Sequence, residues 1–100
     1  MLIVLAKAKM GEGTLEKARD AIAAMVEASN AEEGCISYTF TIDVLDPTSL
    51  VIVEKWVDDA ALLAHFQTSH MVAFNAAIAP LDVSIVEVLK YQSDEGSPVM

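Results

Sequence analysis

The spacing of apolar residues along this chain changes between two periods, and that change constrains the fold more than any other feature. Between Ile36 and Val44 every second residue is apolar, as in a strand with one face against a core. Between Leu15 and Ser29 the apolar and small residues recur every three or four positions, as on one face of a helix. One hundred residues is the size of a single domain, so all of these elements must share one core.

Turn residues divide the chain into six segments. Pro47 lies in a polar tetrapeptide suited to a tight turn between two strands, and Pro80 ends the last helical run. The predicted order is strand, helix, strand, strand, helix, strand, over residues 2–9, 14–30, 35–44, 50–57, 60–79 and 83–91. The second helical segment is expected to break at Thr68 or Ser69.

Polar residues at the starts of the helices indicate how each begins. Thr14 is predicted to cap the first helix, and Asp58 or Asp59 the second, because short oxygen-bearing side chains accept the free N–H groups there. A four-stranded antiparallel sheet with both helices on one face is the simplest closed arrangement for this order of elements. The sequence therefore predicts an α+β fold of ferredoxin-like βαββαβ topology.

The domain is expected to span residues 1–92. Residues 93–100 are mostly polar and contain glycine and proline, a composition typical of a disordered chain end. We therefore predict a tail after the last strand.

Three of the predicted strands are apolar on both faces. In the last strand, Val83, Ile85 and Leu89 are expected on one face and Val86 and Val88 on the other. Two helices can cover only one face of such a sheet, so a monomer would leave the second apolar face in water. Packing on the same face of a second copy explains the pattern. We therefore predict a homodimer formed through the sheet.

Charge and hydropathy exclude two classes of partner. Fifteen acidic residues against six basic ones give a net charge of −9, which repels a phosphate backbone, so nucleic acid is not an expected partner. The longest uncharged apolar runs fall far short of the ~20 residues needed to cross a bilayer. The chain opens on a strand-like run without the basic and apolar regions of a secretory signal. We expect no membrane contact and a cytoplasmic location.

One set of positions between the first helix and the last strand carries a more specific pattern. Its members are Glu33, Gly34, Cys35, Tyr38, Pro47, Glu54, Trp56, His65, Thr68, His70 and Phe74. This pattern resembles that of antibiotic biosynthesis monooxygenase domains. The resemblance implies a dimeric α+β barrel of ferredoxin-like subunits, each with a pocket between its helices and its sheet. It also implies oxidation of a quinol or aromatic phenol by dioxygen, with no cofactor and no metal.

Such chemistry needs a base, because a deprotonated phenol can itself reduce dioxygen once the protein binds and shields it. His65 and His70 are the only histidines and the leading candidates. On an unbroken helix they would lie roughly 140° apart, whereas a break near Thr68 brings them together. The alternative is structural: His65 would be a buried residue bonded to a carbonyl, and His70 a capping or surface residue.

Glu54 and Trp56 lie on the same face of one predicted strand. A large ring beside a carboxylate lines an aromatic pocket and raises the pKa of the carboxylate, so Glu54 is a further catalytic candidate and Trp56 a substrate-binding one. Tyr38 and Phe74 are expected to line the same pocket. The alternative interpretation is that these aromatic residues are core anchors and that Glu54 is paired with a lysine or with the backbone.

Three other functions compete with this one. Haem-degrading relatives of the fold use an asparagine on the first strand, and this chain has none there. An isomerase of a phosphorylated dione signal would need a phosphate-binding cation, for which the strands offer Lys7, Lys9, Lys55 and Lys90. The third alternative is a non-catalytic stress-response module whose pocket holds a small apolar ligand, because fold alone does not establish a reaction.

Overall fold

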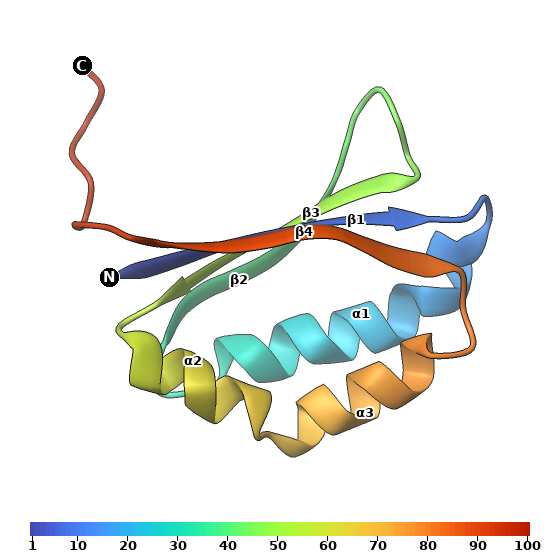
Figure 1. Ribbon diagram of the computed structural model, residues 1–100, viewed down its shortest axis with the longest axis horizontal. Helices are drawn as coiled ribbons and strands as arrows, with labels where there is room; N and C mark the ends of the chain where they lie inside the picture. Colours follow the sequence, from blue (N-terminus) through green and yellow to red (C-terminus); the bar gives the residue numbers. More distant parts are fainter.

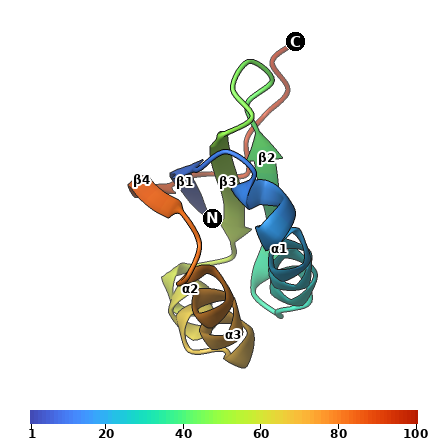
Figure 2. The ribbon, with the colours of Figure 1, turned by 90° about the vertical axis from the view of Figure 1, so that its right-hand side faces the viewer.

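The computed structural model describes residues 1–100, and its seven elements form a sheet covered on one face by helices (Figures 1 and 2). The sheet is antiparallel throughout, with strand order β2-β3-β1-β4. The predicted ferredoxin-like topology is confirmed, and the second helical segment consists of two helices. In chain order the elements are β1 (Leu2–Met10), α1 (Thr14–Asn30), β2 (Cys35–Ile42), β3 (Ser49–Trp56), α2 (Asp59–Phe66), α3 (Ser69–Ile78) and β4 (Val83–Gln92).

The starts of the helices follow two of the three predictions. Asp58 accepts a hydrogen bond from the N–H of Ala61 at 2.9 Å and caps α2. Thr68 accepts one from the N–H of Met71 at 3.3 Å, so it ends the break and begins α3. The prediction for Thr14 is wrong. Gly13, with φ of 80°, occupies the cap of α1 in a left-handed conformation that favours glycine, and Thr14 is the first helical residue.

The core lies between the inner face of the sheet and α1. Every second residue of β1 is buried, which places Leu2 and Val4 in one apolar cluster with Trp56 from β3 and Met25 from α1. A second cluster at the other end of the sheet contains Ala18 of α1. Burial of these side chains, at about 25 cal/mol per Å² of apolar surface, is the main force holding α1 on the sheet.

The last strand corrects one part of the predicted pattern. Lys7 pairs with Glu87 and the next residue of β1, Ala8, pairs with Ile85, so Val86 is an extra residue in a β-bulge. The bulge reverses the alternation beyond it. Val88 therefore lies on the inner face opposite Ala6, and Leu89 on the outer face opposite Leu5, the reverse of the prediction.

Residues 93–100 belong to no helix or strand. They leave the sheet beside the N-terminus, where the N–H of Ser93 donates to the carbonyl of Met1 at 2.8 Å (Figure 1). None of the helices has the length and apolar character that crossing a membrane requires.

Candidate functional site

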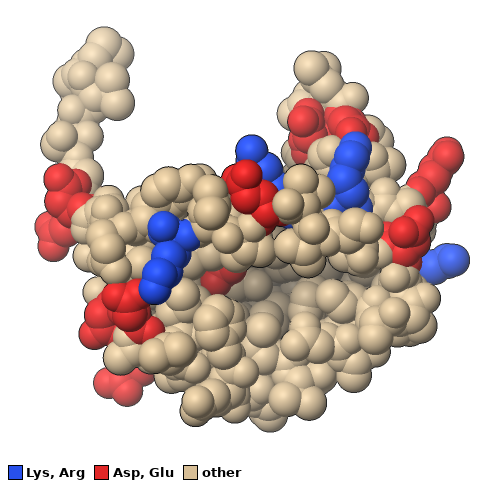
Figure 3. Space-filling model, viewed as in Figure 1, with Lys and Arg blue, Asp and Glu red and all other residues tan.

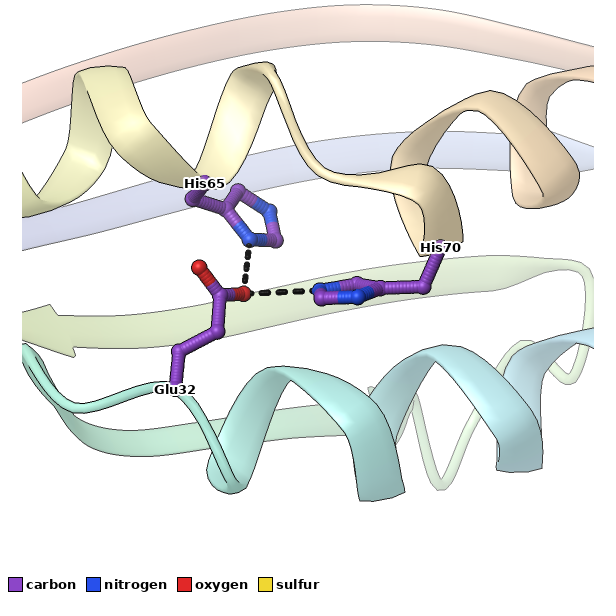
Figure 4. Close-up of side chains that lie close together, drawn as sticks. All are labelled: Glu32, His65 and His70. Carbon is purple, nitrogen blue, oxygen red and sulfur yellow. Dashed lines mark hydrogen bonds and ion pairs between the residues drawn. The ribbon is translucent and has the colours of Figure 1, made fainter.

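The two histidines meet at a single carboxylate oxygen (Figure 4). Glu32 Oε2 lies 2.6 Å from Nδ1 of His65 and 2.8 Å from Nε2 of His70. An ionised carboxylate can only accept hydrogen bonds, so both ring nitrogens that face it carry a proton and donate. In the neutral imidazoles this leaves Nε2 of His65 and Nδ1 of His70 as free acceptors.

Local structure explains how three distant residues converge. Glu32 lies in the turn after α1, where its N–H donates to the carbonyl of Ser29 and its carbonyl accepts from the N–H of Cys35, both at 3.1 Å. His65 lies in the last turn of α2 and His70 in the first turn of α3, and the break at Thr68 lets both side chains point toward the turn after α1. The break thus brings the histidines together, as the sequence predicted.

Sequence reasoning missed Glu32. Its partners lie 33 and 38 residues further along the chain, so only the packing of α2 and α3 against the turn after α1 makes the contact. An acidic residue in a polar turn carries no local signal that separates it from an ordinary solvated carboxylate. The neighbouring Glu33, which belonged to the recognised pattern, is exposed and contacts neither imidazole.

A close contact sets the distance between this turn and α2. A side chain added at Gly34 would collide with Cβ of Ala61, so glycine allows the turn to approach the helix. Asn30 fixes the other side of the turn: its side chain accepts from the N–H of Tyr38 at 3.0 Å and donates to the carbonyl of Tyr38 at 2.9 Å. The position of Glu32 is therefore determined by contacts from both directions.

His65 lies deep in the aromatic part of the core. It is 2% exposed, and its ring centroid is 4.7 Å from that of Trp56 and 5.6 Å from that of Tyr38. The predicted grouping of a histidine with these two aromatic residues is therefore present. His70, with its side chain 23% exposed, lies on the solvent side of Glu32.

Glu54 is buried beside Trp56, whose Nε1–H donates to Oε1 of Glu54 at 3.1 Å. Burial raises the pKa of the Glu54 carboxyl above its ordinary value, and the hydrogen bond from Trp56 opposes part of that rise. Burial also raises the pKa of the Tyr38 phenol, which lies directly opposite Glu54 in the sheet. Burial therefore shifts the protonation equilibrium of both groups toward the neutral form.

Several polar atoms of this cluster have no partner within the chain. They are Oε2 of Glu54, the hydroxyl of Tyr38 and Nε2 of His65. None of the three is fully enclosed by protein, because the only fully enclosed side-chain polar atom that lacks a hydrogen bond is Oγ of Ser29. The three atoms therefore remain available to a ligand or to water.

A cavity of about 340 Å³ lies beside the cluster, between α2 and the inner face of β1 and β4. Figure 3 shows the molecule hollowed between β4 and the helices below it. The lining is mostly apolar and consists of Val4, Asp59, Leu62, Leu63, Phe66, Val88, Leu89 and Lys90. None of the six predicted site residues is among them, but Val4 pairs with Glu54 in the sheet and packs in one cluster with Trp56. Cavity and cluster therefore adjoin.

The structure does not bring all six predicted residues around one cavity. His70 and Phe74 line a second space of about 220 Å³ between α1 and α3. Phe74 contacts Phe40 edge to face, with ring centroids 6.0 Å apart. Phe74 therefore lines a different space from the cavity between α2 and β4.

Of the four strand lysines, only Lys90 lines the cavity beneath the sheet. Its ammonium group lies 3.0 Å from Oδ1 of Asp59, while Gln92 donates to Oδ2 of the same carboxylate at 2.8 Å. The Lys90 hydrogen bond holds the pKa of Asp59 below its usual range. Lys7 and Lys9 instead line a hollow on the outer face of the sheet.

The single thiol contributes no nucleophile to this site. Cys35 is partly buried at the start of β2, and burial raises its pKa to about 11. At neutral pH it is therefore a protonated thiol, and it packs against the apolar cluster around Trp56.

Comparison with known proteins matches residues 1–77 to the antibiotic biosynthesis monooxygenase family. The protein named Putative monooxygenase YcnE from Bacillus subtilis is 32% identical over 93 residues, which cover 88% of this chain and 98% of that protein. Probable quinol monooxygenase YgiN from Escherichia coli is 33% identical over 88 residues, covering 78% and 85% of the two chains.

Solved structures show the same fold. A structure described as an antibiotic biosynthesis monooxygenase superposes with a TM-score of 0.82 at 26% identity, covering 94% of this chain and 99% of the other. A second, from Deinococcus radiodurans, superposes with a TM-score of 0.89 at 21% identity and covers 100% of this chain and 99% of the other.

Proposed function

We propose that this chain, which belongs to the antibiotic biosynthesis monooxygenase family, uses dioxygen to oxidise a quinol or a related aromatic phenol. Family membership and the names of both curated relatives support the monooxygenase class. The name of the Escherichia coli relative supports a quinol as substrate. In the proposed reaction a quinol and dioxygen give a hydroxyquinone and water, so the quinol supplies every electron and no separate reductant is needed.

The observation that carries the proposal is the contact between Glu32 and His65. Because the carboxylate holds the proton on Nδ1, the lone pair of the neutral imidazole is on Nε2, which no group of the chain occupies. A phenolic hydroxyl beside Nε2 would transfer its proton there, and the resulting anion would donate electrons to dioxygen. The surrounding aromatic residues keep water from the anion.

The cavity under β4 is the proposed substrate site. Its volume of about 340 Å³ falls within the roughly 300–1,000 Å³ typical of small-molecule pockets. An apolar lining suits an aromatic ring system, and Oε2 of the buried Glu54 carboxyl, which has no partner in the chain, would form a hydrogen bond with a substrate hydroxyl. Trp56 would then position both Glu54 and His65.

One observation favours a second candidate, a binding module without catalysis. The cavity wall contains none of the six candidate residues, so a ligand could occupy it without touching His65. An isomerase of a phosphorylated substrate has less support, because the single cavity-lining lysine, Lys90, is already paired with Asp59.

The proposed assembly is a homodimer formed through the outer face of the sheet. That face carries a contiguous apolar patch, and its members in β1, β3 and β4 are Ile3, Leu5, Val51, Val53, Leu89 and Tyr91. Leu89 and Tyr91 are 44% and 46% exposed in the single chain. A second copy of the same face would cover them.

The experiment that tests the function measures oxygen consumption with reduced benzoquinones and naphthoquinones, corrected for their uncatalysed oxidation. Isotopically labelled dioxygen should place one labelled atom in the hydroxyquinone. Replacing the proposed base in His65→Ala should lower kcat by about 10²–10⁴-fold. Tight quinol binding with no turnover in either protein would instead support the binding module.

A further inference from the structure

We propose that Glu32, His65 and His70 form a binding site for a divalent transition-metal ion, with Zn²⁺ as the ion that suits them best. The ligand atoms are Oε2 of Glu32, Nδ1 of His65 and Nε2 of His70, and all lie within 4.8 Å of one another. They come from the turn after α1, from α2 and from α3, and Figure 4 shows both ring nitrogens facing the Glu32 carboxylate oxygen.

The chemistry of the ligand set selects the class of ion. Imidazole nitrogen suits zinc, copper, iron and nickel, whereas magnesium and calcium prefer oxygen ligands. Two histidines and one glutamate form an established ligand set for zinc that keeps a fourth position open. The site therefore fits Zn²⁺ rather than Mg²⁺ or Ca²⁺.

The distances require only a small rearrangement around the carboxylate. Ligands about 2.0–2.1 Å from a tetrahedral zinc ion lie about 3.3 Å from one another. The contacts of 2.6 and 2.8 Å at Glu32 would lengthen by about 0.7 and about 0.5 Å, and the two imidazoles would turn toward each other. His70 is the ligand free to move, because its side chain is partly exposed and lies beyond the helix break.

The charge of Glu32 is not balanced by any lysine or arginine. The ion pairs that involve those residues are Lys9 with Asp46, Arg19 with Glu16 and Lys90 with Asp59, whereas Glu32 contacts only the two imidazoles. With neutral imidazoles the cluster carries one negative charge in a chain of net charge −9. A divalent cation would be attracted to it.

The site is open to solvent on two sides. Glu32 lines a surface groove that also includes Ala64 and Thr68, and His70 lines the space between α1 and α3. An ion could enter by either route, and water would complete its coordination.

Metal binding would oppose the role proposed for His65. An imidazole that gives the lone pair of Nδ1 to an ion carries its proton on Nε2, so it has no free lone pair for a substrate hydroxyl. Zinc would therefore inhibit the oxidation. That consequence rests on the proposed function, whereas the metal site itself does not.

The test is a titration of the metal-free protein with Zn²⁺ by calorimetry, and with Co²⁺ by visible absorption, in the absence of any substrate. The expected result is one ion per chain and a Co²⁺ spectrum of low-symmetry coordination by nitrogen and oxygen. Glu32→Gln and His70→Ala should each weaken binding by at least about tenfold. The adjacent control Glu33→Gln and the thiol control Cys35→Ser should bind as the unaltered chain does.

Absence of binding at millimolar metal, or unchanged affinity in both Glu32→Gln and His70→Ala, would overturn the metal site. Circular dichroism of each variant excludes loss of fold as the reason for weakened binding, and two independent ligand variants keep the test decisive if one of them unfolds. A failure of quinol turnover leaves these binding results unaffected, so the two proposals are tested separately.

Discussion

The imidazole of His65 lies against the indole of Trp56, with ring centroids 4.7 Å apart and ring planes inclined by 45°. The same indole donates a hydrogen bond to the buried carboxyl of Glu54. Trp56 therefore connects the proposed base with the second titratable group of the site. A substitution at Trp56 should therefore affect both His65 and Glu54.

Trp56→Phe keeps an aromatic ring and removes the N–H donor. The unfolding free energy should fall by about 1–3 kcal/mol, because Glu54 loses its buried hydrogen-bond donor. The pKa of Glu54 should rise further, since that hydrogen bond lowers it. Urea unfolding and NMR titration of the carboxyl carbon check the two effects. An unchanged Glu54 pKa in the folded variant would contradict this account.

Glu32→Gln should lower kcat of quinol oxidation by about tenfold or more, less than the full loss of the base. The amide can turn its NH₂ group toward Nδ1 of His65, which moves the ring proton to Nε2 and removes the free lone pair. KM should change little, because Glu32 does not line the cavity under β4 that is the proposed substrate site. Glu33→Gln, with the same chemical change one residue away, is the control. Equal rates in the two variants would show that Glu32 has no part in the reaction.

Tyr91→Lys should convert the proposed homodimer to a monomer, because an unpaired ammonium group cannot be buried at an apolar interface without a large cost. Tyr91 is 46% exposed in the single chain and does not line the cavity under β4, so the monomer should keep its fold. Sedimentation velocity at micromolar concentration measures the change. Val72→Lys, at a residue of α3 that is 68% exposed, should remain dimeric. A monomeric unaltered chain would contradict the proposed assembly directly.

Asp46→Asn should destabilise the turn between β2 and β3 at neutral pH. Asp46 accepts from Lys9 at 2.7 Å, from the hydroxyl of Thr48 at 2.6 Å and from that of Ser49 at 2.8 Å. These bonds, with that of Lys9 the strongest, hold the pKa of Asp46 well below its ordinary 3.8.

When folding lowers the pKa of a carboxyl, the carboxyl stabilises the folded state at any pH above its pKa in the unfolded chain. That stabilisation is lost as the pH falls through the pKa of the carboxyl in the folded chain. The unaltered chain should therefore be more stable than Asp46→Asn at pH 7, and the difference should shrink below about pH 4. Urea midpoints at a series of pH values measure it. Asp20→Asn, which changes an exposed carboxyl on α1, should show no such trend.

Most of the fold could be predicted because apolar residues recur clearly at every second position in the strands and at every third or fourth position in the helices. Turn-forming residues separate these segments. The bulge at Val86 could not, because valine and leucine on both faces of β4 fit either phase of the alternation. The cap at Gly13 was missed because Thr14 is the better side-chain cap by residue type, and the left-handed backbone of the glycine made it unnecessary.

The candidate site was predictable to the extent that it depends on local structure. His65 and His70 come together because of the helix break, which Thr68 signals in the sequence. Glu32 depends on the docking of α2 and α3 against the turn after α1, and no local pattern reports such docking. The separation of Phe74 from the larger cavity likewise depends on how the helices pack.

The extra residue at Val86 makes the length of β4 as important as its composition. Deleting this one valine would restore strict alternation and exchange the outward and inward side chains of the strand on one side of it. Some side chains of β4 that line the cavity would then join the outer apolar patch, and some from the patch would line the cavity, without any change of residue type. Directed evolution of substrate preference in this strand should therefore use substitutions and avoid insertions or deletions.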